Sequence, residues 1–283
     1  MNILIKNCNL ISMSNKREKY EMEMDIYIEE NKIKEIGKNI NINEENIKVI
    51  EGKNKILMPG LINTHSHIPM SIFRETLDGY TLQEWLEQKI WPMEDKLTRE
   101  DVYNATLLSC IEMIKTGTTT INDMYFFTDE IIKASMEMGI RLQTTATLMN
   151  ADKGGERRLE DLKKLIDKHS NKYKLLTINM GIHGLYTSDE EYIEKCVKFA
   201  KEEKLLVHTH FCENLKEVED IKKEYNSLPI EVLEKHFKDT KILLAHGVEL
   251  NNEDIERLTK LDAHISHCPI SNLRLGCRCC TSF

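Results

Sequence analysis

The chain of 283 residues lacks any apolar run that approaches the roughly 18 residues of a membrane span. Its first residues, MNILIKNCNLISMS, are too short and too polar for a secretory signal. It also lacks a basic tract, since the formal net charge is −8 and the two signs are interspersed. Such a charge gives no electrostatic footprint for nucleic acid or an anionic membrane. We therefore expect a cytoplasmic protein with a small-molecule partner; the oligomeric state has no signature here.

The sequence motifs of several common zinc sites are also missing. There is no HExxH, no paired CxxC and no PCxxC half of a cytidine-deaminase-type zinc motif. Single cysteines in apolar or strand-like surroundings are typical of reduced, buried thiols. The cysteines of this kind are Cys8, Cys110, Cys196, Cys212 and Cys268.

Residues 1–57 have the pattern of short strands separated by polar turns. The stretches ILIKNCNLISM, MDIYIEENKIKEIGK and IKVIEGKNKILM each alternate in polarity or are rich in β-branched residues. They predict a small all-β module.

From Met58 onward, strand-like runs alternate with segments of helical period. The strand-like runs are 61–65, 118–124, 141–148, 175–183, 205–210, 242–247 and 263–267. Helical segments include 99–117, 188–204 and 251–261, with expected caps at Thr98, Ser188 and Asn251 or Asn252. Seven strands with about six helices predict an α/β fold with a parallel sheet. It is one unit short of an eight-stranded (β/α) barrel.

The stretch PGLINTHSHIPM places His65 and His67 at the end of the first barrel strand. Residues i and i+2 of a strand face the same side, so both imidazoles can converge on one ion at the barrel mouth. Two surface histidines in a loop would explain the same pattern equally well.

Further strand-end histidines favour the metal site. Packing alone does not easily explain histidines at the ends of five of the seven strands. His208 lies one layer deeper than His210 on the same face, and we interpret it as structural or as support for a ligand. The further strand-end histidines are His183, His210, His246 and His267.

An ordered series of motifs extends over the chain to residue 276: PGLINTHSH, LQEWLEQKIWPMEDKLTREDVY, EMIKTGTTTINDMYFF, HFCE and SNLRLG. In this series the chain resembles the amidohydrolase superfamily, and within it the 5′-methylthioadenosine/S-adenosylhomocysteine deaminase branch. HxH marks only the superfamily, whereas EWL with IWPME points to the branch. The resemblance implies a (β/α)8 metal-dependent hydrolase barrel over residues 58–276, truncated after about the seventh strand. Residues 1–57 would form part of a small composite β-sandwich.

The resemblance also implies roles for single residues. His65, His67 and His210 would bind one divalent metal ion, usually zinc in this branch. Glu213 would hydrogen-bond the purine and deliver a proton to its ring nitrogen. His246 would steady the attacking water or its developing charge.

Residues that would contact the rest of the substrate follow from the same resemblance. Glu94 would hold the ribose diol and His183 would contact the nucleoside. Arg158, or Arg157 beside it, would lie near the polar tail. The alternatives are that Glu94 is a solvated charge at a helix end and Arg158 a surface cation. Glu213, three residues after a ligand, is less easily explained as an idle charge.

The chemistry of this set is coherent. A metal lowers the pKa of bound water from about 15.7 towards 7, so a nucleophile for C6 of adenine exists at neutral pH. Attack pushes charge onto a ring nitrogen, which a carboxylic acid beside it can protonate. Histidines with one carboxylate accept Zn, Fe, Mn or Ni, so the metal's identity stays open.

The last seven residues, CRCCTSF, depart from the family pattern. The family continues with a stretch resembling ASGIAPV and an eighth strand that ends in a metal-binding Asp, the second carboxylate. A one-base shift in one synonymous coding sequence converts CRCCTSF into AGVAPV. We therefore interpret residues 277–283 as an out-of-frame tail rather than a metal- or redox-active cysteine cluster. An open barrel would expose strand edges, so we expect low solubility and deaminase activity several orders of magnitude below a full-length relative.

Three hypotheses of function remain. The first is a deaminase that converts S-adenosylhomocysteine, 5′-methylthioadenosine or adenosine into the inosine analogue and ammonia. The second is another amidohydrolase, such as a guanine deaminase or a triazine-type aminohydrolase; Glu94 argues against it, since those substrates carry no ribose. The third is a non-enzymatic remnant, favoured by the missing Asp. The sequence does not rank the nucleosides, although Arg158 would favour the homocysteine tail.

Overall fold

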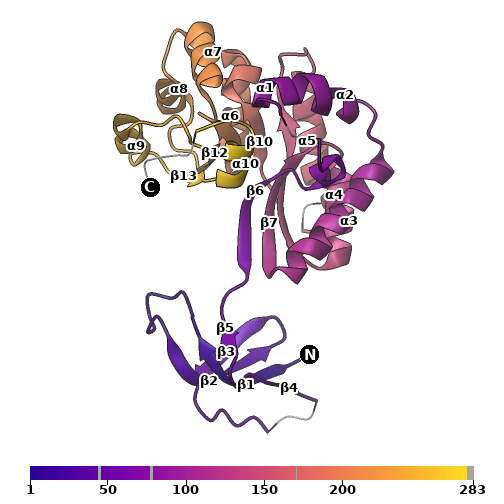
Figure 1. Ribbon diagram of the computed structural model, residues 1–283, viewed down its shortest axis with the longest axis vertical. Coiled ribbons are helices and arrows are strands. Elements are labelled where there is room, and N and C mark those ends of the chain that lie inside the picture. The colour runs from indigo at the N-terminus through magenta and orange to yellow at the C-terminus, as the bar shows by residue number, and fades with distance from the viewer. Residues whose placement is uncertain (44–45, 77–78, 170, 279–283) are drawn as a thin grey trace. The chain divides into compact units, whose positions relative to one another are not determined.

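The computed structural model describes residues 1–43, 46–76, 79–169 and 171–278 (Figure 1). The chain divides into two compact units, Met1–Leu61 and Ile62–Phe283. The tail interpreted as out of frame lies outside the described residues from position 279 onward. Cys277 is buried, and its backbone N–H donates to the carbonyl of Asn272 at 2.8 Å.

The N-terminal unit is a five-stranded mixed sheet with the order β3-β2-β1-β4, in which β5 also pairs with β1. The β1/β2 and β2/β3 pairs are antiparallel, and β4 and β5 run parallel to β1. Four of the strands fall within the stretches that the alternating pattern predicts, whereas β2 begins three residues before its stretch, at Glu21. Their bounds are β1 Ile3–Leu10, β2 Glu21–Glu29, β3 Lys32–Gly37, β4 Lys48–Glu51 and β5 Ile56–Leu57.

A buried carboxylate ties this sheet to the segment after it. Asp25 on β2 is 1% exposed, and it accepts hydrogen bonds from the backbone N–H groups of Asn7 at 2.9 Å and Ile40 at 3.0 Å. Buried backbone donors need an acceptor, so this one side chain satisfies a backbone N–H group of β1 and one of the segment after β3.

The second unit is a nearly closed parallel barrel with the strand order β13-β12-β11-β10-β8-β7-β6, and β9 pairs with β8. This confirms the predicted parallel α/β fold. The strand expected at 175–183 is broken at Asn179, whose backbone N–H donates to the carbonyl of Thr144. The bounds are β6 Leu61–Ser66, β7 Thr118–Tyr125, β8 Arg141–Leu148, β9 Leu176–Ile178, β10 Met180–Gly184, β11 Val207–Phe211, β12 Ile242–His246 and β13 Ala263–Ser266.

Helices alternate with the strands around this barrel (Figure 1). No helix within the described ranges is long and apolar enough to cross a membrane. The short helical segments are η1 Ile68–Phe73, α1 Leu82–Trp85, η2 Leu86–Ile90, α2 Trp91–Glu94 and η3 Leu185–Thr187. The others are α3 Arg99–Lys115, α4 Thr128–Met138, α5 Gly155–His169, α6 Glu190–Glu202, α7 Leu215–Tyr225, α8 Pro229–His236, α9 Asn252–Leu258 and α10 Pro269–Arg274.

The predicted caps at Thr98 and Asn251 are confirmed, because their side chains accept from the N–H groups of Asp101 and Asp254. The cap predicted at Ser188 is wrong. That residue ends the η3 turn, and α6 begins two residues later with Asp189 accepting from the N–H of Tyr192 at 2.9 Å.

The two ends of the barrel sheet meet through side chains. Within the part of the chain that the structure describes, β6 and β13 are the terminal strands of the sheet. The hydroxyls of Thr64 on β6 and Ser266 on β13 lie 2.6 Å apart and share a hydrogen bond. The pairs β7/β8, β8/β9, β8/β10, β10/β11, β11/β12 and β12/β13 are parallel, so the carboxyl ends of these strands form one rim.

We expect Asp25→Ala to lower the free energy of unfolding by about 1–3 kcal/mol for each amide that it leaves without an acceptor. Urea unfolding would measure this. Glu29→Ala on the same strand is the control, because Glu29 is partly exposed and pairs with the exposed Lys34. That variant should change stability by less than about 0.5 kcal/mol. Equal losses in the two variants would contradict the structural role of Asp25.

Candidate metal and nucleoside site

The strand-end histidines meet at the rim of the barrel. His65 lies on β6, and the centroid of its ring is 4.9 Å from that of His67, 4.9 Å from that of His210 and 5.2 Å from that of His246. The ring of His183, on β10, is 4.9 Å from that of His210. Five strand-end residues of the sequence prediction are thus brought into one cluster.

Two of these rings point unprotonated nitrogens at each other. The Nδ1–H of His67 donates to the carbonyl of Met124, and the Nδ1–H of His210 donates to the carbonyl of His183, both at 2.5 Å. A neutral imidazole has one N–H, so Nε2 of each ring carries a lone pair. These two Nε2 atoms lie 3.1 Å apart. Two lone pairs are held this close favourably only by a shared proton or a cation, so the donor set fits a metal ion.

The ring of His65 contacts a second histidine deeper in the barrel. Its Nδ1 lies 2.9 Å from Nε2 of His208, and Nδ1 of His208 lies 3.3 Å from Nδ2 of Asn122. Asn122 in turn donates to the carbonyl of Thr64 on the neighbouring strand at 2.9 Å. His208 therefore contacts a predicted ligand. Asn122 is not among the predicted site residues, although its position on a strand beside the histidine pair was a usable signal.

His246 completes the cluster on its other side. The nitrogens of His65, His210 and His246 that could bind an ion lie within 4.8 Å of one another. Nδ1 of His246 donates to Oδ1 of Asn272 at 2.7 Å. Its φ of 78° is in the left-handed region, which costs a non-glycine residue on the order of 1–3 kcal/mol and is common at functional sites.

Glu213 lies beside this histidine. Its side chain is 9% exposed, and its Oε1 lies 3.5 Å from Nδ1 of His246. Burial raises the pKa of Glu213 to about 7, because a carboxylate loses solvation inside the protein. A carboxyl group with this pKa can hold or release a proton at neutral pH.

Burial has the opposite effect on the histidines. It disfavours the imidazolium form, and it lowers the pKa of His67, His183 and His246 to about 4 and that of His208 to about 3. The pKa values of His65 and His210 are also well below 6.5 for the same reason. The cluster is therefore neutral at pH 7, which is the state that binds metal ions.

Glu94, the predicted ribose-binding residue, is linked to the same rim. Its carboxylate accepts a hydrogen bond from the hydroxyl of Tyr125 at 2.6 Å, and burial raises its pKa. Tyr125 ends β7, and the centroid of its ring is 6.3 Å from that of His67. Tyr125 is not among the predicted site residues, although it ends a barrel strand at the histidine rim.

Arg158, predicted near the substrate tail, is already paired. Its Nη1 donates to Oδ1 of Asp152 at 2.6 Å and to the carbonyl of Met149 at 3.0 Å, and its Nη2 donates to Oδ2 of Asp152 at 2.5 Å. Met149 and Asp152 lie in the connection that follows β8, and Arg158 lies near the start of α5. The charge of Arg158 contributes to lowering the pKa of His183.

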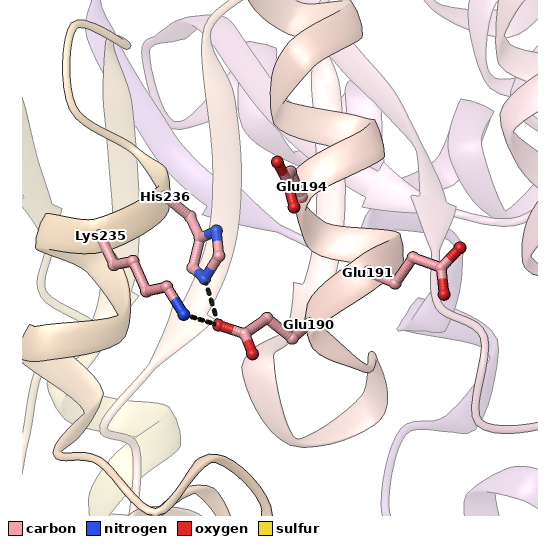
Figure 2. A pocket seen from close by; sticks show the side chains of 5 residues that line it. All are labelled: Glu190, Glu191, Glu194, Lys235 and His236. Carbon is pink, nitrogen blue, oxygen red and sulfur yellow. Dashed lines mark hydrogen bonds and ion pairs between the residues drawn. The ribbon is translucent and has the colours of Figure 1, made fainter.

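A surface depression lies apart from this cluster, between α6 and α8 (Figure 2). Glu190 accepts hydrogen bonds there from Lys235 at 2.5 Å and from His236 at 2.8 Å. None of its lining residues belongs to the histidine cluster, so we do not assign the site to it.

The chain matches one protein family and is similar to two kinds of named deaminase. The model of the Amidohydrolase family matches residues 56–279. The chain is 41% identical over 262 residues to a 5′-deoxyadenosine deaminase from Methanococcus aeolicus, covering 89% of this chain and 61% of the relative. It is 38% identical over 281 residues to a 5-methylthioadenosine/S-adenosylhomocysteine deaminase from Carboxydothermus hydrogenoformans, covering 98% and 64%. The chain thus spans less than two thirds of either relative.

A solved structure agrees with the fold. The atrazine chlorohydrolase from Arthrobacter aurescens, crystallised with zinc, superposes with a TM-score of 0.88 at 25% identity and covers 97% of this chain and 67% of its own. This neighbour and the family support a divalent metal ion for the site.

We expect the metal-free protein to lose stability as the pH falls from about 6.5 towards 4. Six buried histidines have folded pKa values below their ordinary 6.5, so in this interval the unfolded chain binds more protons than the folded one and the free energy of unfolding rises with pH. Acids whose pKa burial raises oppose this trend, namely Glu94, Asp123 and Glu213. Burial also raises the pKa of Glu217, whereas the hydrogen bonds from the N–H groups of Glu213 and Cys212 lower it and favour the carboxylate. Chemical unfolding with a chelator at pH 7 and pH 5 would measure it, and equal or greater stability at pH 5 would contradict it.

Proposed function

Because this chain belongs to the amidohydrolase family, we propose that it is a metal-dependent hydrolytic deaminase of adenine nucleosides. The observation that carries the proposal is the pair of facing Nε2 atoms of His67 and His210, 3.1 Å apart, with the carboxyl group of Glu213 at the same rim. This combination offers a cation site and a proton donor side by side.

His65, His67 and His210 would hold the ion, for which we propose zinc; iron, manganese and nickel suit the same donors. When bound, the ion supplies Lewis acidity that makes water nucleophilic at neutral pH. The carbonyls of Met124 and His183 keep the Nε2 atoms of His67 and His210 free for it.

Glu213 would protonate the purine. Attack at C6 of adenine leaves negative charge on the adjacent ring nitrogen, so an acid must meet that atom. Burial raises the pKa of Glu213 to about 7, so the protonated form is available at neutral pH. His246, held by Asn272, would stabilise the charge on the attacking water.

Glu94 and His183 would bind the nucleoside. A carboxylate accepts two hydroxyl hydrogen bonds from a ribose diol, and the hydroxyl of Tyr125 fixes the direction of Glu94. A ribose contact favours a nucleoside over guanine or a triazine. His183 presents its ring beside His210 at the rim.

The pairing of Arg158 bears on which nucleoside is preferred. Asp152 neutralises Arg158 and takes hydrogen bonds from both of its terminal nitrogens. A substrate carboxylate would have to displace Asp152 to bind there. We therefore propose that substrates with a neutral 5′ substituent, such as 5′-deoxyadenosine and 5′-methylthioadenosine, are preferred over S-adenosylhomocysteine.

The rate of turnover is a separate matter. Among the described residues, the group of donor atoms that lie within 4.8 Å of one another holds histidines and no carboxylate. The metal-binding Asp of the family pattern is not part of that group. The expectation of weak turnover relative to a full-length deaminase stays a prediction.

We expect His67→Ala and His210→Ala each to weaken zinc binding by more than about tenfold. Replacing a residue that only orients a ligand already costs about tenfold, and the loss of a ligand should cost more. Zinc retained after dialysis against a zinc buffer would measure this. His264→Ala is the control, because His264 lies on β13 with its side chain 75% exposed. Unchanged zinc content in the two site variants would contradict the assignment of the ion.

We expect the zinc-loaded chain to release ammonia from 5′-deoxyadenosine and 5′-methylthioadenosine faster than from S-adenosylhomocysteine. Glu213→Gln should lower kcat by about 10² or more, the usual contribution of a general acid. Glu219→Gln, an exposed residue of α7, is the control. A coupled ammonia assay against the Methanococcus aeolicus enzyme would measure both.

Other outcomes would identify the alternatives. Turnover of guanine or a triazine without turnover of any nucleoside would support another aminohydrolase. Absence of both zinc binding and ammonia release would support a non-enzymatic remnant. Equal rates for neutral and carboxylate-bearing tails would contradict the role of Asp152.

A further inference from the structure

The carboxyl group of Glu217 is buried at the edge of the site. Glu217 lies in the first turn of α7 and is 3% exposed. Its Oε1 accepts a hydrogen bond from the backbone N–H of Cys212 at 2.8 Å, and its Oε2 accepts one from the backbone N–H of Glu213 at 2.7 Å. Both oxygens thus bind the turn that joins β11 to α7.

The turn between β11 and α7 presents two backbone N–H groups that one carboxylate can accept together. Cys212 has a φ of 50°, in the left-handed region, and the two successive amides converge on one carboxylate. Consecutive N–H groups in such a turn form a concave site for an anion. The carbonyl of Cys212 accepts from the N–H of Glu249 at 2.9 Å, so the residue is held at both its amide and its carbonyl.

The consequence reaches the side chain of Glu213. Its backbone amide is bonded to Glu217, while its carboxyl group is buried within 3.5 Å of His246. A rotation of this turn would move the carboxyl group away from the histidine rim. We propose that Glu217 is a positioning residue, whose carboxylate fixes the backbone of Cys212 and Glu213 and thereby aims the carboxyl group of Glu213 at the substrate.

This inference rests on the proposed role of Glu213 but uses different residues and different bonds. A simpler role for Glu217 would be to begin α7. The N-cap bond of that helix is a separate one, because the side chain of Asn214 accepts from the N–H of Glu217 at 2.9 Å. The cap and the turn can therefore be tested independently.

Glu217→Gln tests the turn. The amide offers one oxygen, so one of the two backbone N–H groups faces an NH₂ group instead of an acceptor. Asn214→Ala is the matched control, since it removes the cap and leaves both oxygens of Glu217 in place. We expect the amides of Cys212 and Glu213 to exchange hydrogen for deuterium at least about tenfold faster in Glu217→Gln than in wild type or Asn214→Ala.

Measurements of kcat, KM and zinc content distinguish a role of Glu217 in positioning Glu213 from a general loss of structure. In Glu217→Gln we expect kcat for 5′-deoxyadenosine to fall about tenfold or more, with zinc content unchanged and KM changed by less than about threefold. Asn214→Ala should keep the wild-type kcat.

Unchanged exchange in Glu217→Gln, or the same kinetic loss in Asn214→Ala, would overturn the inference. If wild type releases no ammonia from any nucleoside, the proposed function fails. In that case, faster hydrogen exchange limited to Glu217→Gln still shows that the carboxylate holds the turn. Unchanged exchange rejects the role of Glu217 in the turn as well.

Discussion

The site depends on two hydrogen bonds that decide which nitrogen of a ring is free. His67 and His210 each donate Nδ1–H to a backbone carbonyl, and this leaves Nε2 of each ring as the acceptor that faces the other. The same residues with the opposite tautomer would present an N–H to the rim and repel a cation. The chemistry of the cluster is therefore set by main-chain carbonyls as much as by the histidines themselves.

The parallel sheet supplies those carbonyls. Met124 lies on β7, the neighbour of β6, and His183 lies on β10, the neighbour of β11. His67 and His210 are thus each oriented by the adjacent strand, and Asn122 on β7 links the backbone of β6 to His208 on β11. A site of this kind cannot be assembled on one strand, because the histidine and the carbonyl group that orients its ring come from different strands.

The sequence predicted the elements and the histidines well, because both leave strong local signals. The run at 141–148 coincides with β8, and period-two spacing placed His65 and His67 at the end of β6. Residues that act through long-range contacts left weaker signals. Glu217 is one of many charges in a charged helix, and only its burial distinguishes it. Tyr125 resembles an ordinary strand-end aromatic until its contact with Glu94 is known. The cap of α6 shifted by one residue because Ser188 and Asp189 are both good cap residues.

The alternation of side chains along β11 limits how this protein can change in length. His208 and His210 pair in register with Leu243 and Ala245 of β12. A one-residue shift in the register of β11, such as an insertion ahead of His208 would cause, would turn both imidazoles to the opposite face and bring Thr209 to the rim in their place. Changes of this kind would abolish the cluster even where the barrel still formed. In the evolution of this chain, insertions and deletions are therefore tolerable in the connections between strands and excluded from the strands that carry the histidines.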